Sequence, residues 1–297
     1  MASEHQFVLD LTIALGASAI SGFVAHRLRQ PALLGYLAAG LLIGPSGFGL
    51  LNDVQQIEEL AEIGVAFLLF ALGVEFSLAK LKRVQKIAVQ GSLLQMGTTA
   101  ALALVIAVVA GWAISVLQGI FLGFVLALSS TAVVLKLLTD RGETAAVHGQ
   151  LMLAILIAQD LALGLMLAFL PALDQPEAFW VVLAAAVLKF VLFLVGAIAV
   201  GRWGVPPLMR TIAATESQEL FLLTIIALCL GIAWVTSRLG LSIEMGAFVA
   251  GLMVSEVDYS EQALGRVLPL RDTFACLFFA SVGMLIDPQV LISNGAI

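Results

Sequence analysis

Apolar residues in this chain occur in blocks of roughly 20 residues that end at glycine, proline or a cluster of charges. Inside a block, apolar and polar residues do not alternate as they would in a strand with one buried face. A block of this length is long enough to cross a bilayer as one α-helix. The pattern predicts about ten membrane-spanning helices, at residues 6–26, 31–45, 56–77, 87–111, 118–138, 146–170, 178–203, 217–237, 242–255 and 268–287.

The composition supports a membrane protein over a soluble one. Hydrophobic residues make up 61% of the chain and charged residues 11%, whereas soluble domains are roughly half apolar and a quarter charged. Cys229 and Cys276 lie inside apolar blocks, which predicts neither a disulfide nor a metal site. We therefore expect a protein of the lipid bilayer that is not an enzyme, has no cofactor and binds no nucleic acid.

Basic residues are distributed unevenly between the two ends of the predicted helices. If the N-terminus lies outside, all but two of the 14 Lys and Arg residues fall on the cytoplasmic side. The exceptions are Arg238, which falls outside, and Lys189, which lies within a helix. Because positive charge collects in cytoplasmic loops, we expect a multi-pass protein of the cell membrane with its N-terminus outside.

The sequence also contains a repeat in which the two copies have opposite orientations. Gly35–Leu41 reads GYLAAGL, and Gly246–Leu252, 211 residues later, reads GAFVAGL. Phe67–Gly73 matches Leu277–Gly283 at an offset of 210, and the first and eighth predicted helices are also in register. Each copy lies seven helices after its counterpart, and because seven is odd the two copies enter the membrane from opposite sides. Inverted repeats are typical of secondary transporters, although small-residue packing motifs also recur by chance in helix bundles.

The repeat predicts how the chain is divided. We expect one transmembrane domain over residues 1–297, with a first repeat at about 6–170, a linking helix at about 178–203 and a partial second repeat at about 217–297. Counterparts of the fifth and sixth predicted helices would lie about 210 residues further on, beyond Ile297. The repeat thus predicts that the domain is incomplete at its C-terminal end.

Asp160 is the main candidate for ion chemistry because it lies near the middle of the predicted helix 146–170. That helix contains no Lys or Arg to neutralise it. Charged groups within a membrane are costly and therefore indicate function by default. A carboxyl group shielded from water retains a proton more readily than a solvated one, so Asp160 could exchange a proton for a cation. The alternative is an aspartic acid that serves packing alone.

A run of small hydroxyl residues, Ser129, Ser130 and Thr131, lies at the middle of the predicted helix 118–138. Such side chains can satisfy backbone groups where a helix unwinds, and their oxygens suit a partly dehydrated monovalent cation. Ser and Thr also serve helix–helix packing. Because the run has the same predicted depth as Asp160, we expect the two to form one site.

Other ionisable residues are weaker candidates. Lys189 could pair with a carboxylate, act as an accessory titrating charge or extend toward the membrane surface. Glu75, Glu244 and Asp10 lie near helix ends, where a solvated or capping carboxylate is common. No metal site is expected beyond that of the transported cation.

Five motifs in order resemble the membrane domain of the monovalent cation:proton antiporter-2 family, and within it the Kef-type potassium/proton antiporters. They lie at Gly35–Gly40 running to Gly44–Pro45, at Leu128–Ala132, at Gln159–Asp160, at Met245–Gly251 and at Phe278–Met284. The resemblance covers essentially the whole chain. It implies a sodium/hydrogen exchanger domain of thirteen helices, of which about ten are present here.

The resemblance also implies roles for the site residues. One unwound helix would run around Thr131, and Asp160 would be the carboxylate that binds the proton or the cation. Electrogenic relatives carry a second carboxylate immediately before that aspartate, whereas this chain has Gln159, which argues for electroneutral exchange. The resemblance further implies a homodimer and a regulatory domain or subunit that lies outside this chain.

We therefore predict a secondary active transporter that exchanges potassium, or alternatively sodium, for protons by alternating access at Asp160. Mutually exclusive binding of the proton and the cation would couple the two fluxes. A cation channel and an inactive membrane fragment remain the alternatives. Saturable exchange that requires a counter-ion would exclude a channel.

Overall fold

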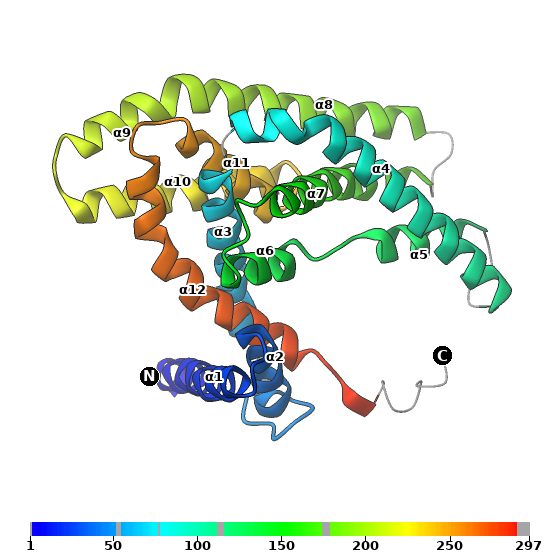
Figure 1. Cartoon of the computed structure of the whole chain (residues 1–297), viewed down its shortest axis with the longest axis horizontal. Helices are drawn as coiled ribbons and strands as arrows, with labels where there is room; N and C mark the ends of the chain where they lie inside the picture. The colour runs from blue at the N-terminus through cyan, green and yellow to red at the C-terminus, as the bar shows by residue number, and fades with distance from the viewer. Residues whose placement is uncertain (1, 52–54, 77, 112–115, 174–178, 290–297) are drawn as a thin grey trace.

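The computed structural model describes residues 2–51, 55–76, 78–111, 116–173 and 179–289, and every regular element within these ranges is a helix (Figure 1). The helices are α1 (Ala2–Arg27), α2 (Ala32–Ile43), α3 (Gln55–Glu75), α4 (Leu78–Val109), α5 (Val116–Ala127), α6 (Thr131–Asp140), α7 (Val147–Leu173), α8 (Phe179–Ala199), the π-helix η1 (Val200–Gly204), α9 (Val205–Ala213), α10 (Gln218–Arg238), α11 (Ile243–Ser255) and α12 (Ser260–Met284).

The ten predicted helices are present, and four of them differ in extent from the prediction. The predicted helix 118–138 is broken into α5 and α6. The predicted helices 87–111 and 268–287 begin earlier, at Leu78 and Ser260, because charged residues continue these helices beyond their apolar blocks. The predicted helix 178–203 continues through η1 into α9, which has prolines in its first turn.

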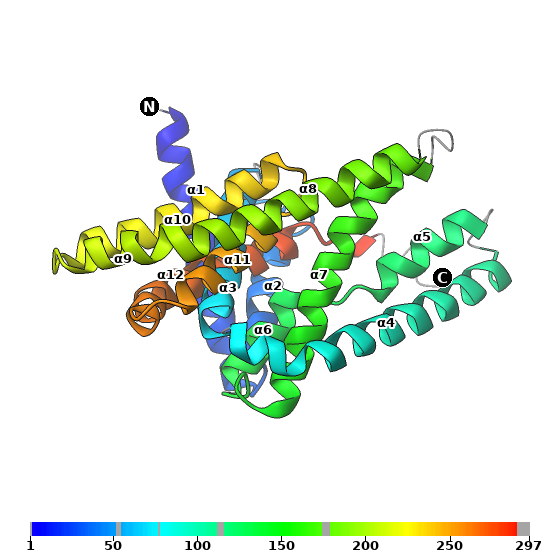
Figure 2. The same ribbon diagram turned by 90° about the horizontal axis from the view of Figure 1, so that it is seen from above.

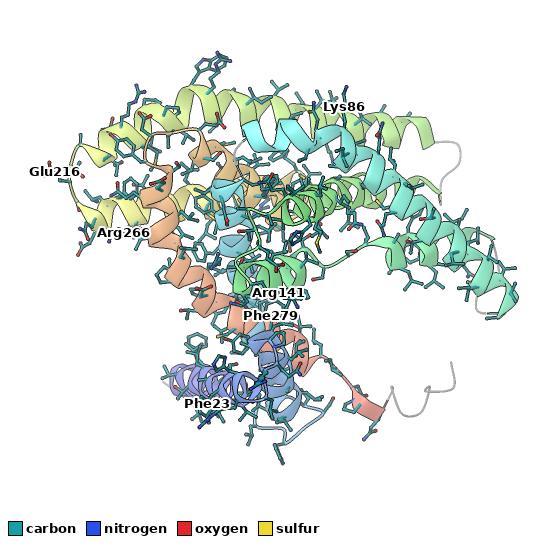
Figure 3. The ribbon with its side chains drawn as sticks, viewed as in Figure 1. Phe23, Lys86, Arg141, Glu216, Arg266 and Phe279 are labelled. Atoms are coloured by element: carbon teal, nitrogen blue, oxygen red, sulfur yellow. The ribbon has the colours of Figure 1, made fainter. Side chains whose placement is uncertain are left out.

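Length and hydropathy select six of the described segments as long and apolar enough to cross a membrane. The segments are 6–27, 84–109, 118–141, 187–213, 218–238 and 260–284, and α2 and α11 are shorter apolar helices. Many large apolar side chains point outward: Phe23 on α1 is 61% exposed, whereas Phe279 on α12 is 1% exposed (Figure 3). An apolar outer surface of this extent fits a lipid environment, because soluble monomers rarely expose contiguous apolar patches larger than a few hundred Å².

The helices form two groups that lie side by side (Figures 1 and 2). In the crossing group, which consists of α1–α3 and α10–α12, α3 packs against both α11 and α12, and α2 packs against α12. In the second group, which consists of α4–α7, α4 packs against α5 and α7. The long helix α8 packs against α7 and runs along the crossing group toward α9.

Glycines allow two pairs of helices in the crossing group to approach with their backbones in contact. At the crossing of α2 and α12, a Cβ atom on Gly283 would lie 3.1 Å from the Cα of Gly40. At the crossing of α3 and α11, a Cβ on Gly73 would lie 2.9 Å from the Cα of Gly251, and a Cβ on Gly251 would lie 2.9 Å from the Cα of Gly73. Each crossing therefore depends on residues without a side chain.

The two crossings are equivalent under the sequence repeat. The offset of 211 maps Gly40 onto Gly251, and the offset of 210 maps Gly73 onto Gly283. The contact of α2 with α12 therefore corresponds to the contact of α11 with α3. A Cβ on Gly64 of α3 would lie 2.5 Å from the carbonyl oxygen of Phe274, which is the counterpart of Gly64 itself. A residue that touches its own counterpart lies at a pseudo-twofold axis, so the inverted repeat is also a repeat in space.

Candidate functional site

The site is built at a break in a membrane helix. Helix α5 ends at Ala127 and α6 begins at Thr131, and the backbone of Ser130 between them is extended. The Ser130 hydroxyl accepts a hydrogen bond of 3.3 Å from the Val133 N–H and thereby caps α6. A break of this kind leaves carbonyls at the end of α5 and N–H groups at the start of α6 without intrahelical partners. In a membrane these groups need partners from neighbouring helices.

Two carboxamides from the flanking helices provide such partners. The Ala127 carbonyl accepts hydrogen bonds from Nε2 of Gln95 on α4, at 3.0 Å, and from Nε2 of Gln159 on α7, at 3.4 Å. The Ser129 N–H donates to Oε1 of Gln159 at 3.1 Å. Gln159 also donates to the Gln95 side-chain oxygen and is only 1% exposed. The break is therefore held by two amides, of which Gln159 is buried and Gln95 is half-buried.

Asp160 lies next to this break. The Thr131 hydroxyl, at the first residue of α6, donates a hydrogen bond of 3.1 Å to Oδ2 of Asp160. Thr131 is buried and Asp160 is partly buried. A helix N-terminus carries partial positive charge and favours a nearby carboxylate.

The structure brings together most of the predicted site residues. Thr131 is hydrogen-bonded to Asp160 and the Ser129 N–H to Gln159, so two adjacent pairs join α7 to the break, and Ser130 caps α6 between them. The side chains of Ser129 and Ser130 are exposed, and the Gln159 amide is fully engaged with the break. Lys189 is exposed on α8, and no ion pair between it and Asp160 occurs in the ranges described.

Gln95 was not among the residues predicted from the sequence, although it belongs to the cluster. The sequence feature that could have indicated Gln95 is an amide inside the apolar part of α4. Gln90, on the same helix, has the same feature. Gln95 is half-buried, whereas Gln90 is exposed. An ion pair of 3.0 Å between Lys136 and Asp140 on α6 was not predicted either.

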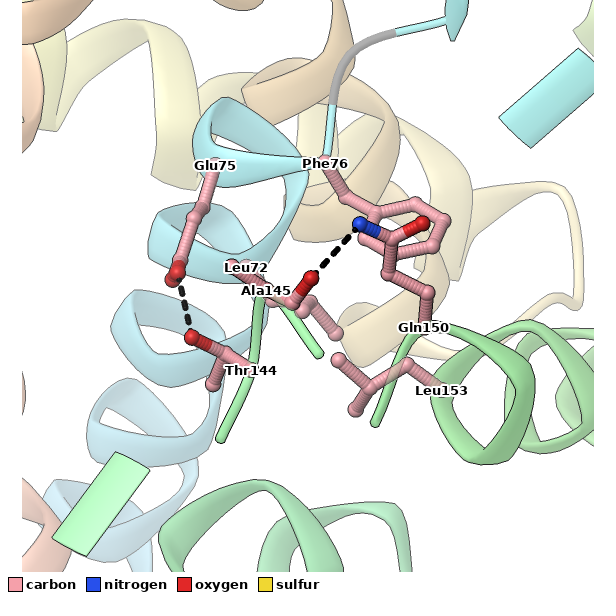
Figure 4. A pocket seen from close by; sticks show the side chains of 7 residues that line it. All are labelled: Leu72, Glu75, Phe76, Thr144, Ala145, Gln150 and Leu153. Atoms are coloured by element: carbon pink, nitrogen blue, oxygen red, sulfur yellow. Dashed lines mark hydrogen bonds between the residues drawn. The ribbon is translucent and has the colours of Figure 1, made fainter. Parts of the chain in front are cut away.

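A second polar contact joins the two helix groups near the end of α3 (Figure 4). The Thr144 hydroxyl, in the turn between α6 and α7, donates a hydrogen bond of 2.7 Å to Oε1 of Glu75, the last residue of α3. Gln150 donates to the Ala145 carbonyl at 3.0 Å across the same small pocket. Glu75, for which the sequence favoured a solvated or capping carboxylate at a helix end, therefore has a partner on the α6–α7 turn.

A helical membrane domain with an inverted repeat and a broken helix beside a carboxylate has the features of a secondary transporter. The chain belongs to the sodium/hydrogen exchanger, transmembrane, family, whose sequence profile matches residues 12–297. This confirms the resemblance drawn from the five motifs.

Several curated relatives from Arabidopsis thaliana are similar over nearly the whole chain. K(+) efflux antiporter 5 is 40% identical over 293 residues, which are 97% of this chain and 51% of the relative. K(+) efflux antiporter 4 is 41% identical over 293 residues, with 97% and 49% covered, and chloroplastic K(+) efflux antiporter 2 is 37% identical over 303 residues, with 98% and 26% covered. The chain thus spans about half the length, or less, of these relatives.

Proposed function

We propose that this chain forms the ion-binding part of a cation/proton antiporter and that Asp160 carries either a proton or a monovalent cation. The observation that carries this proposal is the hydrogen bond from Thr131 to Asp160 beside a broken membrane helix. A carboxylate at this position can bind a cation together with hydroxyl oxygens, and protonation of the carboxylate releases the cation. Potassium is the favoured cation because the relatives are named K(+) efflux antiporters; sodium is the alternative.

The charge of the site supports electroneutral exchange. Gln159 precedes Asp160 and is neutral, so the pair offers one negative charge. One carboxylate binds one proton or one monovalent cation, which gives a 1:1 exchange. Transport would follow from movement of the α4–α7 group against the crossing group, with Asp160 exposed to each side in turn.

The wider setting follows from the sequence and remains part of the proposal. The distribution of basic residues favours an outward N-terminus in a cell membrane, which puts the α6–α7 turn and its contact with Glu75 on the cytoplasmic side. A homodimer and a regulatory domain or subunit outside these residues are further expectations. We expect transport and no catalytic reaction.

Proton/cation exchange in everted membrane vesicles tests the proposal. With an acidic interior, a pH-sensitive dye is quenched, and added potassium or sodium restores its fluorescence if the cation enters as protons leave. We expect saturable dequenching for the wild type and for Asp258→Asn, whose side chain is exposed, and none for Asp160→Asn. Equal dequenching with Asp160→Asn would refute the role of Asp160. Flux that does not saturate or needs no counter-ion would support a channel, and a current proportional to the exchange rate would refute electroneutrality.

A further inference from the structure

Gln95 makes hydrogen bonds both to the helix break and to Gln159, the residue that precedes Asp160. Its Nε2 donates to the Ala127 carbonyl at 3.0 Å, and its Oε1 accepts a hydrogen bond from Nε2 of Gln159. The same Nε2 lies 3.4 Å from the Thr99 hydroxyl, one turn further along α4. Gln95 therefore links α4, the end of α5 and the residue that precedes Asp160.

These contacts leave Gln159 with a single satisfactory orientation. Its Nε2 points to two acceptors, the Gln95 oxygen and the Ala127 carbonyl, and its Oε1 points to the Ser129 N–H. A flipped amide would put oxygen against two oxygens and an NH2 group against an N–H. Because Gln159 is almost completely buried, water cannot compensate for such a mismatch.

We propose that Gln95 is a positioning residue for ion exchange, an inference that rests on the proposed function. Gln95 fixes the Gln159 amide and, with it, holds the Ala127 carbonyl at the end of α5. The Ala127 carbonyl then has two N–H donors and does not coordinate the cation. The cation is instead bound by Asp160 and the hydroxyl oxygens of the break. Both amides are neutral, so they satisfy the break without adding a second negative charge to that of Asp160.

Replacement of Gln95 by glutamate distinguishes a positioning role from a purely structural one. An ionised carboxylate only accepts hydrogen bonds, so it cannot donate to the Ala127 carbonyl and faces that oxygen with like charge. A protonated carboxyl group has one O–H donor and one carbonyl acceptor, and it restores the pattern of the amide. We therefore expect Gln95→Glu to approach wild-type exchange as the pH falls and to depart from it as the pH rises.

The experiment measures the cation concentration that gives half-maximal dequenching, from about pH 5.5 to 8.5. At each pH the value for a variant is divided by the value for wild type, because protons are also substrates and change the wild-type value. For Gln95→Glu we expect the ratio to rise to about tenfold at the alkaline end and to return toward one at the acidic end. Gln95→Leu should show a raised ratio at every pH. Gln90→Glu makes the same chemical change at an exposed position of α4 and should match wild type throughout. A flat ratio near one for Gln95→Glu, or the same profile for Gln90→Glu, would overturn the proposal.

A second measurement separates this inference from the proposed function. Bound cation stabilises the folded state against heating, and the purified protein can show this without transport. If wild-type protein fails to exchange ions, the proposed function is refuted. Positioning by Gln95 would still be supported if the cation raises the melting temperature of wild type and of Gln90→Glu and raises that of Gln95→Leu less. Equal stabilisation of all variants, or none in the wild type, would overturn it.

Discussion

The backbone contact between α3 and α11 can be tested by replacing a glycine with alanine, which adds a single methyl group at the contact. A Cβ on Gly251 would lie 2.9 Å from both the Cα of Gly73 and the backbone nitrogen of Val74, whereas ordinary contact begins at 3.4 Å. The neighbouring atoms belong to a helix backbone and cannot rotate away. Gly251→Ala therefore forces α3 and α11 apart by at least about 0.5 Å at this point.

The expected cost follows from two opposing effects. Overpacking a close-packed interior typically costs about 1–3 kcal/mol. Alanine in the middle of a helix is otherwise favoured over glycine by roughly 1 kcal/mol. At a position with free space only the second effect operates, so the sign of the change should differ between crowded and open glycines. Apart from the adjacent backbone of their own helices, Gly16 on α1 and Gly231 on α10 have no atom within 4 Å of the position that an alanine methyl would take, and each provides an open control.

The measurement is the thermal stability of the purified proteins in a mild detergent, followed as the fraction that remains monodisperse after heating. We expect Gly251→Ala and Gly73→Ala to lose several degrees, because 1 kcal/mol corresponds to about 2–4 °C for domains of this size. Gly16→Ala and Gly231→Ala should be unchanged or more stable. Crossing variants that are as stable as the open controls would show that the backbones do not approach as closely as described.

Three further predictions concern polar contacts. Thr144→Val removes the hydrogen bond of 2.7 Å to Glu75 and should lower stability by about 1 kcal/mol, measured by the same heating assay with Thr144→Ser as the control that keeps the hydroxyl. Ser130→Ala removes the cap of α6 and should cost about 1 kcal/mol, whereas Ser130→Asn should restore most of the loss. The Lys136–Asp140 pair, with side chains 15% and 35% exposed, should couple by less than about 1 kcal/mol, and a larger coupling in a double-mutant cycle would show that it is shielded from water.

The positions of the helices could be predicted from the sequence because a membrane imposes a length and an apolar composition on each span. The ends of the helices could not be predicted in the same way. Hydropathy marks the part of a helix that can lie in lipid, whereas the helix itself continues as long as its backbone bonds are made. This is why α4 begins at Leu78 and α12 at Ser260, among charged residues that apolar blocks exclude.

The site was only partly predictable for a different reason. Asp160 and the hydroxyl run stood out as polar residues at one depth, and the hydrogen bond between Thr131 and Asp160 agrees with that prediction. Gln95 was not distinguishable from Gln90, since both are amides on α4. Five residues turn a helix by about 500°, so the two side chains point roughly 140° apart. The rotation of α4 against α7 decides which amide faces the break, and hydropathy contains no information on it.

The repeat provides what hydropathy does not, a prediction about which helices meet. If two copies of a segment are related by a pseudo-twofold axis, a close approach of α2 to α12 requires a matching approach of α11 to α3, and the small residue at each crossing must recur at the repeat offset. Gly40 and Gly251 satisfy this condition, as do Gly73 and Gly283. We therefore expect Gly40→Ala to destabilise the protein as Gly251→Ala does, because the two positions are equivalent. An alanine tolerated at one of them and not at the other would mean that the sequence repeat is not matched by symmetry in the packing.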